Sequence, residues 1–287
     1  MKFGFLTELE QDNTTKTKTK TKTIKDARYK FLSKLLLDDG YGVEIFNINN
    51  INNINNINNI NNNINNNINI LITPIPFRLS TTSILDVLNK NNIKILAGGL
   101  IDKNTISLCE KFNIKVIDFF QDEQIAILNA IPTAEGAIQI AMQESPKTLF
   151  NSKCLVLGYG RCGKVLANTL KNLGAEVSAT YRNTTDLGYI KTSSLKDIHI
   201  KDLNNYLYNF DFIFNTIPDL VLNKHNLKYI NKNSVIIDLA TSPGGVDYTL
   251  ARELGLNALY CPSLPSRVAP LTSAEILRDC LYKTLDL

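Results

Sequence analysis

Short apolar runs alternate with longer segments of helical spacing along most of this chain. In the first half, residues 24–37 and 102–112 show the helical spacing. Between and around them lie short apolar runs, which predict strands at residues 1–6, 43–46, 70–73, 93–96 and 114–119. Strands that alternate with helices are typical of a parallel sheet with helices on its faces, so the pattern predicts an α/β fold.

Two tracts interrupt this pattern. Residues 14–23 consist only of Thr and Lys, and residues 47–70 consist only of Asn and Ile. Neither composition shows a helix or strand period, and both are predicted to be loop insertions. The Asn/Ile tract is also a β-aggregation hazard. We assign no function to either tract.

The second half is organised around a glycine motif. The apolar run 153–157 leads into Gly158-Tyr159-Gly160-Arg161-Cys162-Gly163, and a helical pattern over 164–173 follows directly. In a dinucleotide site the first glycine permits the turn, the second admits a pyrophosphate and the third lets helix and strand pack closely. The new helix presents free N–H groups to the phosphates. Strand, motif and helix together predict a dinucleotide-binding domain.

The next strand, residues 175–180, bears on the choice of cofactor. NAD-selective sites carry an acid on the ribose about 20 residues into the motif. Here the strand leads into Tyr181-Arg182-Asn183, and no acid lies between Glu176 and Asp186. A guanidinium at this place suits a 2′-phosphate, so NADP is the predicted cofactor. The alternative is a solvated loop arginine.

Two further strand ends carry polar residues. The strand predicted at 210–214 leads into Asn215-Thr216, and the strand at 235–239 leads into Ala240-Thr241-Ser242. Ligands of open parallel sheets bind outside the carboxyl ends of the strands, so both tips are predicted to border the cofactor. The complete predicted cofactor-binding set is Gly158, Tyr159, Gly160, Arg161, Cys162, Gly163, Tyr181, Arg182, Asn183, Asn215, Thr216, Ile217, Pro218, Ala240 and Thr241.

The fold expected from these elements is α/β, with two Rossmann-like parallel-sheet domains and a cleft between them. The boundary falls in residues 129–136, where Pro132 is predicted to end one helix and begin another. Domain one is then 1–130 and contains both insertions, and domain two, the dinucleotide-binding domain, is 131–287. Within domain two we expect a last strand at 256–260, an irregular proline-rich loop at 261–270, and a C-terminal helix at 273–285.

Composition narrows the class of protein. The net charge of +4 over 287 residues does not indicate a nucleic-acid partner, and no apolar run predicts a membrane span. Five cysteines without a CxxC pair suggest a reduced, cytoplasmic protein. The two histidines, His199 and His225, are not expected at strand tips, which argues against a hydroxyacid dehydrogenase that uses a catalytic histidine. No metal site is predicted.

Five motifs in this order resemble the A subunit of dipicolinate synthase from spore-forming bacteria. They are NAIPTAEG at 129–136, GYGRCG at 158–163, NTIP at 215–218, DLATSPGG at 238–245 and LPSRVA at 264–269. Asp26-Ala27-Arg28 also resembles the start of that family's first helix. The chain departs from the family pattern at Ser242, Ser266 and Leu271.

The resemblance implies an NADP-linked oxidoreductase that converts dihydrodipicolinate to dipicolinate during sporulation. It further implies that the chain is an oligomer and forms a heteromer with a second, flavoprotein-like subunit in the cytoplasm of the mother cell. Alternatives are another NAD(P)-dependent oxidoreductase of the hydroxyacid or amino-acid dehydrogenase type, or a non-catalytic cofactor-binding partner subunit. A small dicarboxylate substrate needs cationic donors, and Arg267 is the candidate clamp. Glu135 is the candidate proton acceptor and Ser242 a candidate hydroxyl contact, although each could equally serve a local structural role.

Overall fold

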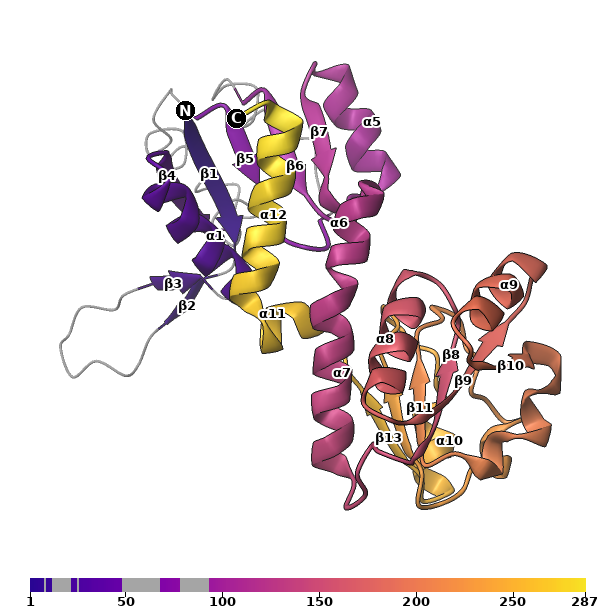
Figure 1. Ribbon diagram of the computed structural model, residues 1–287. Coiled ribbons are helices and arrows are strands. Elements are labelled where there is room, and N and C mark those ends of the chain that lie inside the picture. The colour runs from indigo at the N-terminus through magenta and orange to yellow at the C-terminus, as the bar shows by residue number, and fades with distance from the viewer. Residues whose placement is uncertain (8, 12–21, 25, 48–67, 78–92) are drawn as a thin grey trace. The chain divides into compact units, whose positions relative to one another are not determined.

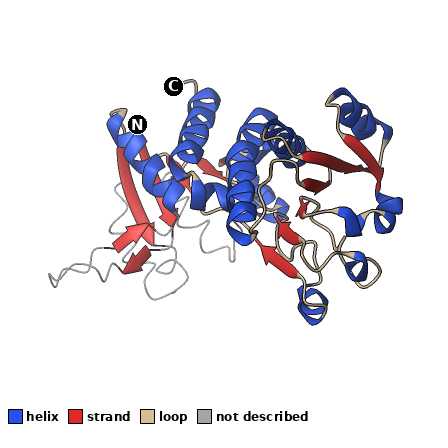
Figure 2. Ribbon diagram, turned by 60° about the horizontal axis from the view of Figure 1, so that its bottom comes forward, coloured by secondary structure: helices blue, strands red, loops and turns tan. Residues whose placement is uncertain are grey.

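The computed structural model describes residues 1–7, 9–11, 22–24, 26–47, 68–77 and 93–287 (Figure 1). These residues form two compact units, each with its own sheet and helices beside it (Figure 2). The first unit comprises residues 1–126 and 270–287, and the second comprises residues 127–269. Most of both low-complexity tracts lies outside the described residues, so their loop character stays a prediction.

The first unit contains a five-stranded parallel sheet in the order β4-β1-β5-β6-β7. Its strands are β1 (Lys2–Thr7), β4 (Gly42–Asn47), β5 (Ile70–Ile72), β6 (Ile95–Gly98) and β7 (Lys115–Asp118). A separate antiparallel pair is formed by β2 (Leu9–Gln11) and β3 (Lys22–Ile24). The helices are α1 (Ala27–Asp38), α5 (Lys103–Lys111), the 3-10 turn η2 (Phe119–Gln121), α6 (Glu123–Leu128, of which the last two residues fall in the second unit) and α12 (Pro270–Leu285).

Helix α12 belongs to the first unit, which corrects the expectation that residues 131–287 form one domain. It packs against α1, and its buried face includes Leu277 and Leu281. At its end the Tyr282 hydroxyl donates to Asp39 Oδ2 at 2.6 Å, and Lys283 Nζ donates to Asp122 Oδ2 at 2.8 Å. The apolar face of an amphipathic helix indicates that the helix packs on another surface, but it does not indicate which surface. The sequence therefore could not show that α12 belongs to the first unit.

The second unit contains a six-stranded parallel sheet in the order β10-β9-β8-β11-β12-β13. Its strands are β8 (Lys153–Leu157), β9 (Glu176–Tyr181), β10 (Lys196–His199), β11 (Phe212–Asn215), β12 (Val235–Asp238) and β13 (Asn257–Tyr260). The chain leaves β8 in one direction for β9 and β10 and returns on its other side for β11. Ligands bind at such a reversal of strand order. The predicted pair of parallel-sheet α/β domains is confirmed.

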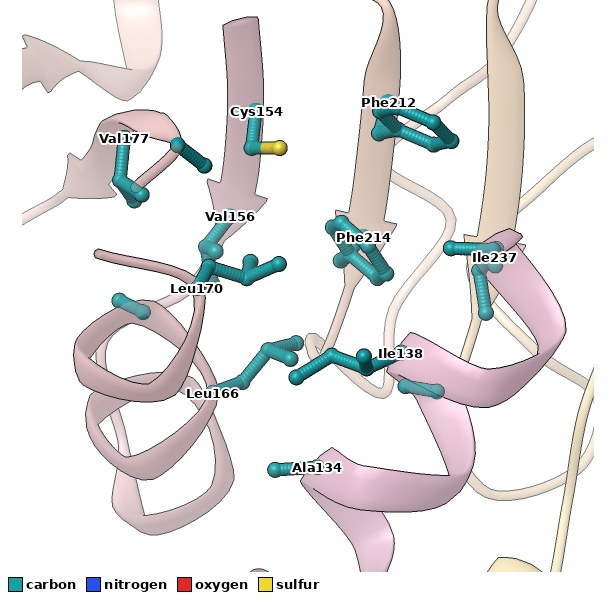
Figure 3. Close-up of a cluster of buried hydrophobic side chains, with 14 of the residues drawn as sticks. Ala134, Ile138, Cys154, Val156, Leu166, Leu170, Val177, Phe212, Phe214 and Ile237 are labelled. Atoms are coloured by element: carbon teal, nitrogen blue, oxygen red, sulfur yellow. The ribbon is translucent and has the colours of Figure 1, made fainter. Parts of the chain in front are cut away.

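Helices complete the second unit. They are α7 (Ala130–Glu144), α8 (Arg161–Asn172), α9 (Thr184–Thr192), α10 (Tyr248–Glu253) and α11 (Leu264–Val268), with 3-10 turns η3 (Ile200–Asn205), η4 (Leu207–Asn209) and η5 (Leu227–Tyr229). Figure 3 shows the core on one face of the sheet, where Leu166 and Leu170 of α8 and Ile138 of α7 point toward Val156 and Phe214. All five side chains are buried.

The sequence 123–144 forms α6 and α7 with a break at Asn129. Pro132 is the third residue of α7, where its missing N–H needs no intrahelical partner, so a helix begins close to it. The break itself falls at Asn129 and not at Pro132, which corrects the predicted position. Together the two helices are long and apolar enough to cross a membrane by length and composition, contrary to our expectation of no such run. Ala134 and Ile138 of this segment are buried in the core, so its apolar character has a structural explanation.

The proline-rich segment 261–270 is more regular than expected. Pro265 lies in the first turn of α11 and Pro270 is the first residue of α12. Proline is tolerated at these positions because the first-turn N–H groups have no intrahelical acceptor. The expectation of an irregular loop was therefore wrong. Strand β10 and helices α9 and α10 were not predicted at all.

Candidate nucleotide-binding site

A cavity of about 530 Å³ lies at the carboxyl ends of the central strands of the second unit. Its walls are the glycine motif, the segment after β9, and the loops after β11 and β12. The lining residues are Gly158, Tyr159, Gly160, Arg161, Cys162, Thr180, Tyr181, Arg182, Asn183, Asp186, Ile200, Thr216, Ile217, Pro218, Leu239, Ala240 and Thr241. Every predicted cofactor residue except Gly163 and Asn215 is in this set.

Each of the three glycines of the motif is suited to its position for a different structural reason. Gly158 has φ +91°, which L side chains rarely adopt. A Cβ on Gly163 would lie 2.2 Å from the carbonyl oxygen of Gly158, so only glycine lets α8 start this close to β8. A Cβ on Gly160 would meet nothing within 4 Å. Gly160 is also the N-cap of α8 and makes no side-chain cap. The start of α8 therefore borders open space in the cavity, which is where a pyrophosphate binds in sites of this kind.

Strand β9 supplies a second anchor for the motif. Thr180 is buried at its end, and its Oγ1 accepts a hydrogen bond from Gly158 N at 2.9 Å. This threonine was missed because a buried hydroxyl gives no sequence signal. Beyond it, Arg182 and Asn183 are exposed on the cavity wall.

Asp186 is an acidic residue in the cavity wall, close to Arg182 in the sequence, and an acid at this place could contact the ribose of NAD. Asn183 caps α9 by accepting from Asp186 N at 2.8 Å, and its Nδ2 donates to Asp186 Oδ2 at 2.9 Å. Asp186 is the third residue of α9, and it and the N-cap residue Asn183 are thus joined by two hydrogen bonds in a reciprocal cap. This local structural role accounts for its presence without a ribose contact.

The loop after β12 is held by Asp238, which is fully buried. Its Oδ1 accepts from Asn215 Nδ2 at 2.9 Å and from Ala240 N at 3.0 Å. Its Oδ2 accepts from Gly245 N at 2.6 Å and from the Tyr248 hydroxyl at 2.5 Å. Burial and then the bond to Asp238 raise the pKa of Tyr248, so the hydroxyl stays a donor. Four donors satisfy a carboxylate that would otherwise be costly to bury.

Asn215 links this network to the loop after β11. Its Oδ1 accepts from Ile217 N at 3.1 Å, and its Nδ2 donates to Ile217 O at 3.1 Å as well as to Asp238. A Cβ on Gly245 would lie 2.1 Å from Asn215 Nδ2, so the two loops meet with no space between them. Asn215 and Gly163 therefore support the cavity from beneath rather than line it.

The three predicted catalytic residues lie in the second unit but outside the cavity lining. Glu135 is exposed on α7, Arg267 is exposed on α11, and Ser242 is exposed in the loop after β12. Helices α7 and α11 are in contact, because Gly136 of α7 faces Leu264 and Val268. Glu135 and Arg267 thus come from two packed helices. Their roles stay predictions.

The position of His199 differs from the expectation that neither histidine lies at a strand tip. It ends β10, beside Tyr181 at the end of β9, and the two ring centroids are 5.1 Å apart at 75°. It is therefore at a strand tip, contrary to expectation. Its Nδ1 accepts from Lys201 N at 3.3 Å, so it caps the following turn. The strand was too short and too polar to recognise.

These features define the second unit as a nicotinamide dinucleotide-binding domain of the dehydrogenase type. Residues 125–244 match the model of the D-isomer specific 2-hydroxyacid dehydrogenase, NAD binding domain. The chain is 35% identical over 191 residues to the A subunit of dipicolinate synthase from Bacillus subtilis (strain 168). That alignment covers 67% of this chain and 64% of the relative, somewhat less than two thirds of its length.

Solved structures agree with the sequence comparison. The crystal structure of the A subunit of dipicolinate synthase from Bacillus halodurans superimposes with a TM-score of 0.77 at 25% identity, covering 100% of this chain and 98% of that one. The corresponding crystal structure from Bacillus subtilis gives 0.77 at 26%, covering 100% and 96%. The resemblance to the A subunit of dipicolinate synthase, which the motifs suggested, is confirmed by the sequence comparison and by these structures.

Proposed function

We propose that this chain oxidises dihydrodipicolinate to dipicolinate with NADP⁺, together with a second subunit, in the cytoplasm of a sporulating cell. The observation that carries the proposal is the nucleotide cavity, whose walls include residues from three of the five motifs in which the chain resembles dipicolinate synthase, those at 158–163, 215–218 and 238–245. The relatives are named as one subunit of that enzyme, and the name implies a second subunit for them.

The preference for NADP⁺ rests on the two charged groups near the expected ribose. Arg182 is exposed on the cavity wall and offers a planar set of donors that matches a phosphate. Asp186 is the competing group, since an acid there would favour the free ribose hydroxyls of NAD⁺. Its carboxylate already accepts from Asn183, and its backbone N–H completes the helix cap. The arginine is therefore the group available to the cofactor.

The reaction removes a hydride and a proton from the dihydropyridine ring and leaves an aromatic pyridine. The nicotinamide, when bound, accepts the hydride at its C4. We assign to Arg267 the binding of a substrate carboxylate by two parallel hydrogen bonds. Ser242 would orient the substrate through its hydroxyl, and Glu135 would take up the proton. All three side chains are exposed in the second unit, as groups that meet a substrate must be.

The test is the formation of dipicolinate by the purified protein, first by itself and then after co-expression with the product of a neighbouring gene. We expect absorbance from NADPH to rise and dipicolinate to appear, with the larger rate in the presence of the partner. Arg267→Ala should abolish turnover while leaving NADP⁺ affinity unchanged, and Arg267→Lys should restore part of it. Oxidation of a 2-hydroxy acid in place of dihydrodipicolinate would contradict the proposed substrate.

Cofactor choice is tested separately by calorimetry. Arg182→Ala should weaken NADP⁺ binding by about 1.5–3 kcal/mol, the scale of a hydrogen bond to a charged group, and leave NAD⁺ nearly unchanged. Lys191→Ala, an exposed cation in the last turn of α9 and not part of the cavity wall, is the matched control. Equal losses for both cofactors in Arg182→Ala would contradict the assignment.

A further inference from the structure

A second cavity of about 270 Å³ adjoins the nucleotide cavity. Arg182 and Ile200 line both, so the two cavities are neighbours at the carboxyl end of β9. The second cavity also contains Lys201, Asn204, Asp219 and His225 in its walls. No sequence motif pointed to it, because its residues come from three separate segments.

Three chain segments converge at this place for definable reasons. Strand β10 pairs with β9 so that His199 lies opposite Tyr181, and Arg182 and Ile200 directly follow the two strands at neighbouring positions of the same sheet edge. Lys201 is the next residue after Ile200 and lines the cavity with them. The third segment is the loop after β11. Asn204 Nδ2 reaches it by donating to the carbonyl oxygen of His225 at 3.4 Å.

The charges of this cavity favour an anion. Arg182 and Lys201 are exposed, and within the described part of the chain neither side chain is held in an ion pair. Other lysines of the same unit are paired, such as Lys196 with Glu176 at 3.0 Å. Asp219 is the acid in the cavity wall, and its Oδ1 accepts from Leu220 N at 2.9 Å. Two cations with free donors around a polar cavity are what a phosphate monoester requires.

We propose that this second cavity is the subsite for the 2′-phosphate of NADP⁺, with Lys201 as a specificity-determining residue beside Arg182 and with His225 as a further donor. The inference rests on the proposed NADP⁺ function and names residues that the glycine motif does not predict. Because Arg182 lines both cavities, a phosphate bound in the second one lies beside the nucleotide cavity, which favours the cofactor's own phosphate over a separate phosphorylated ligand.

The test is calorimetric titration of the full-length wild-type protein and of Lys201→Ala and His225→Ala with NADP⁺, NAD⁺, 2′-AMP and inorganic phosphate. Lys224→Ala is the matched control, because Lys224 is an exposed cation adjacent to His225 that does not line the cavity. We expect Lys201→Ala to weaken NADP⁺ and 2′-AMP by about tenfold or more, and His225→Ala by a smaller factor. NAD⁺ binding should stay within about twofold, the range of a surface change.

The outcomes separate the two proposals. A wild-type preference for NADP⁺ that persists in Lys201→Ala overturns the subsite and leaves the proposed cofactor standing. Absence of that preference in the wild-type protein overturns the proposed cofactor and the subsite with it. Inorganic phosphate that binds the wild type and does not compete with NADP⁺ assigns the cavity to a separate anion, which also overturns the subsite.

Discussion

Replacing Asp238 by asparagine should destabilise the second unit by roughly 2–4 kcal/mol. The amide keeps one acceptor oxygen and presents an NH₂ group to the other pair of donors. If the NH₂ group faces Gly245 N and the Tyr248 hydroxyl, the hydroxyl can turn and accept, but the buried Gly245 N–H loses its acceptor. An unsatisfied buried donor costs about 1–3 kcal/mol, and the three remaining bonds lose their charge assistance.

The assay is urea unfolding followed by circular dichroism, with the free energy of unfolding extrapolated to water. Asp238→Ala removes every acceptor and should cost at least as much, because each buried donor left without an acceptor costs about 1–3 kcal/mol. Asp197→Asn changes an exposed carboxylate on the edge strand β10 and should stay within about 0.5 kcal/mol of wild type. Wild-type stability in Asp238→Asn would refute the claim that four donors depend on this carboxylate.

Other predictions concern the same unit. Gly160→Ala should keep the melting temperature and weaken cofactor binding, because its Cβ enters the open space of the cavity. Gly163→Ala should lower both the melting temperature and the cofactor affinity, because its Cβ meets the Gly158 carbonyl oxygen at 2.2 Å. Equal melting temperatures for the two variants would contradict this explanation. Burial alone raises the pKa of Asp211, but donated hydrogen bonds lower it on balance, so its contribution to stability should be lost as pH falls below about 4, and Asp211→Asn should flatten that profile of melting temperature against pH. Partial burial raises the pKa of the Cys162 thiol, so alkylation at pH 7, followed by mass spectrometry, should be slow. Bound cofactor should slow it further because Cys162 lines the cavity, and fast labelling would contradict the raised pKa.

The glycine motif was recognisable in the sequence because its requirements are local. Gly158 needs a positive φ and Gly163 needs the absence of a Cβ, and both conditions arise within a strand, a turn and a helix that are consecutive in the chain. The strand tips at Thr216 and Ala240 were predictable for a related reason. Parallel strands place their carboxyl ends at one edge, so residues that follow buried strands gather there without any knowledge of distances.

Long-range contacts account for what the sequence did not reveal. The position of α12 depends on which apolar surface it meets, and its partner α1 lies more than 230 residues earlier in the sequence. Lys201 and His225 acquire a common cavity only because β10 pairs beside β9 and the loop after β11 reaches the same edge. No spacing rule connects a short polar strand with a distant loop, so neither residue could be selected beforehand.

Asn215 illustrates why a strand tip does not by itself identify a ligand contact. It is the last residue of β11 and was predicted to touch the cofactor, yet it is fully buried and bonded to Asp238. Side chains alternate between the two faces of a strand, so at a tip one residue supports the loop and the next one faces the ligand. Here Asn215 fixes the backbone of Ile217, and Thr216 and Ile217 line the cavity. The positions beneath a nucleotide site can thus be as specific as those that line it, because the geometry of the loop depends on them.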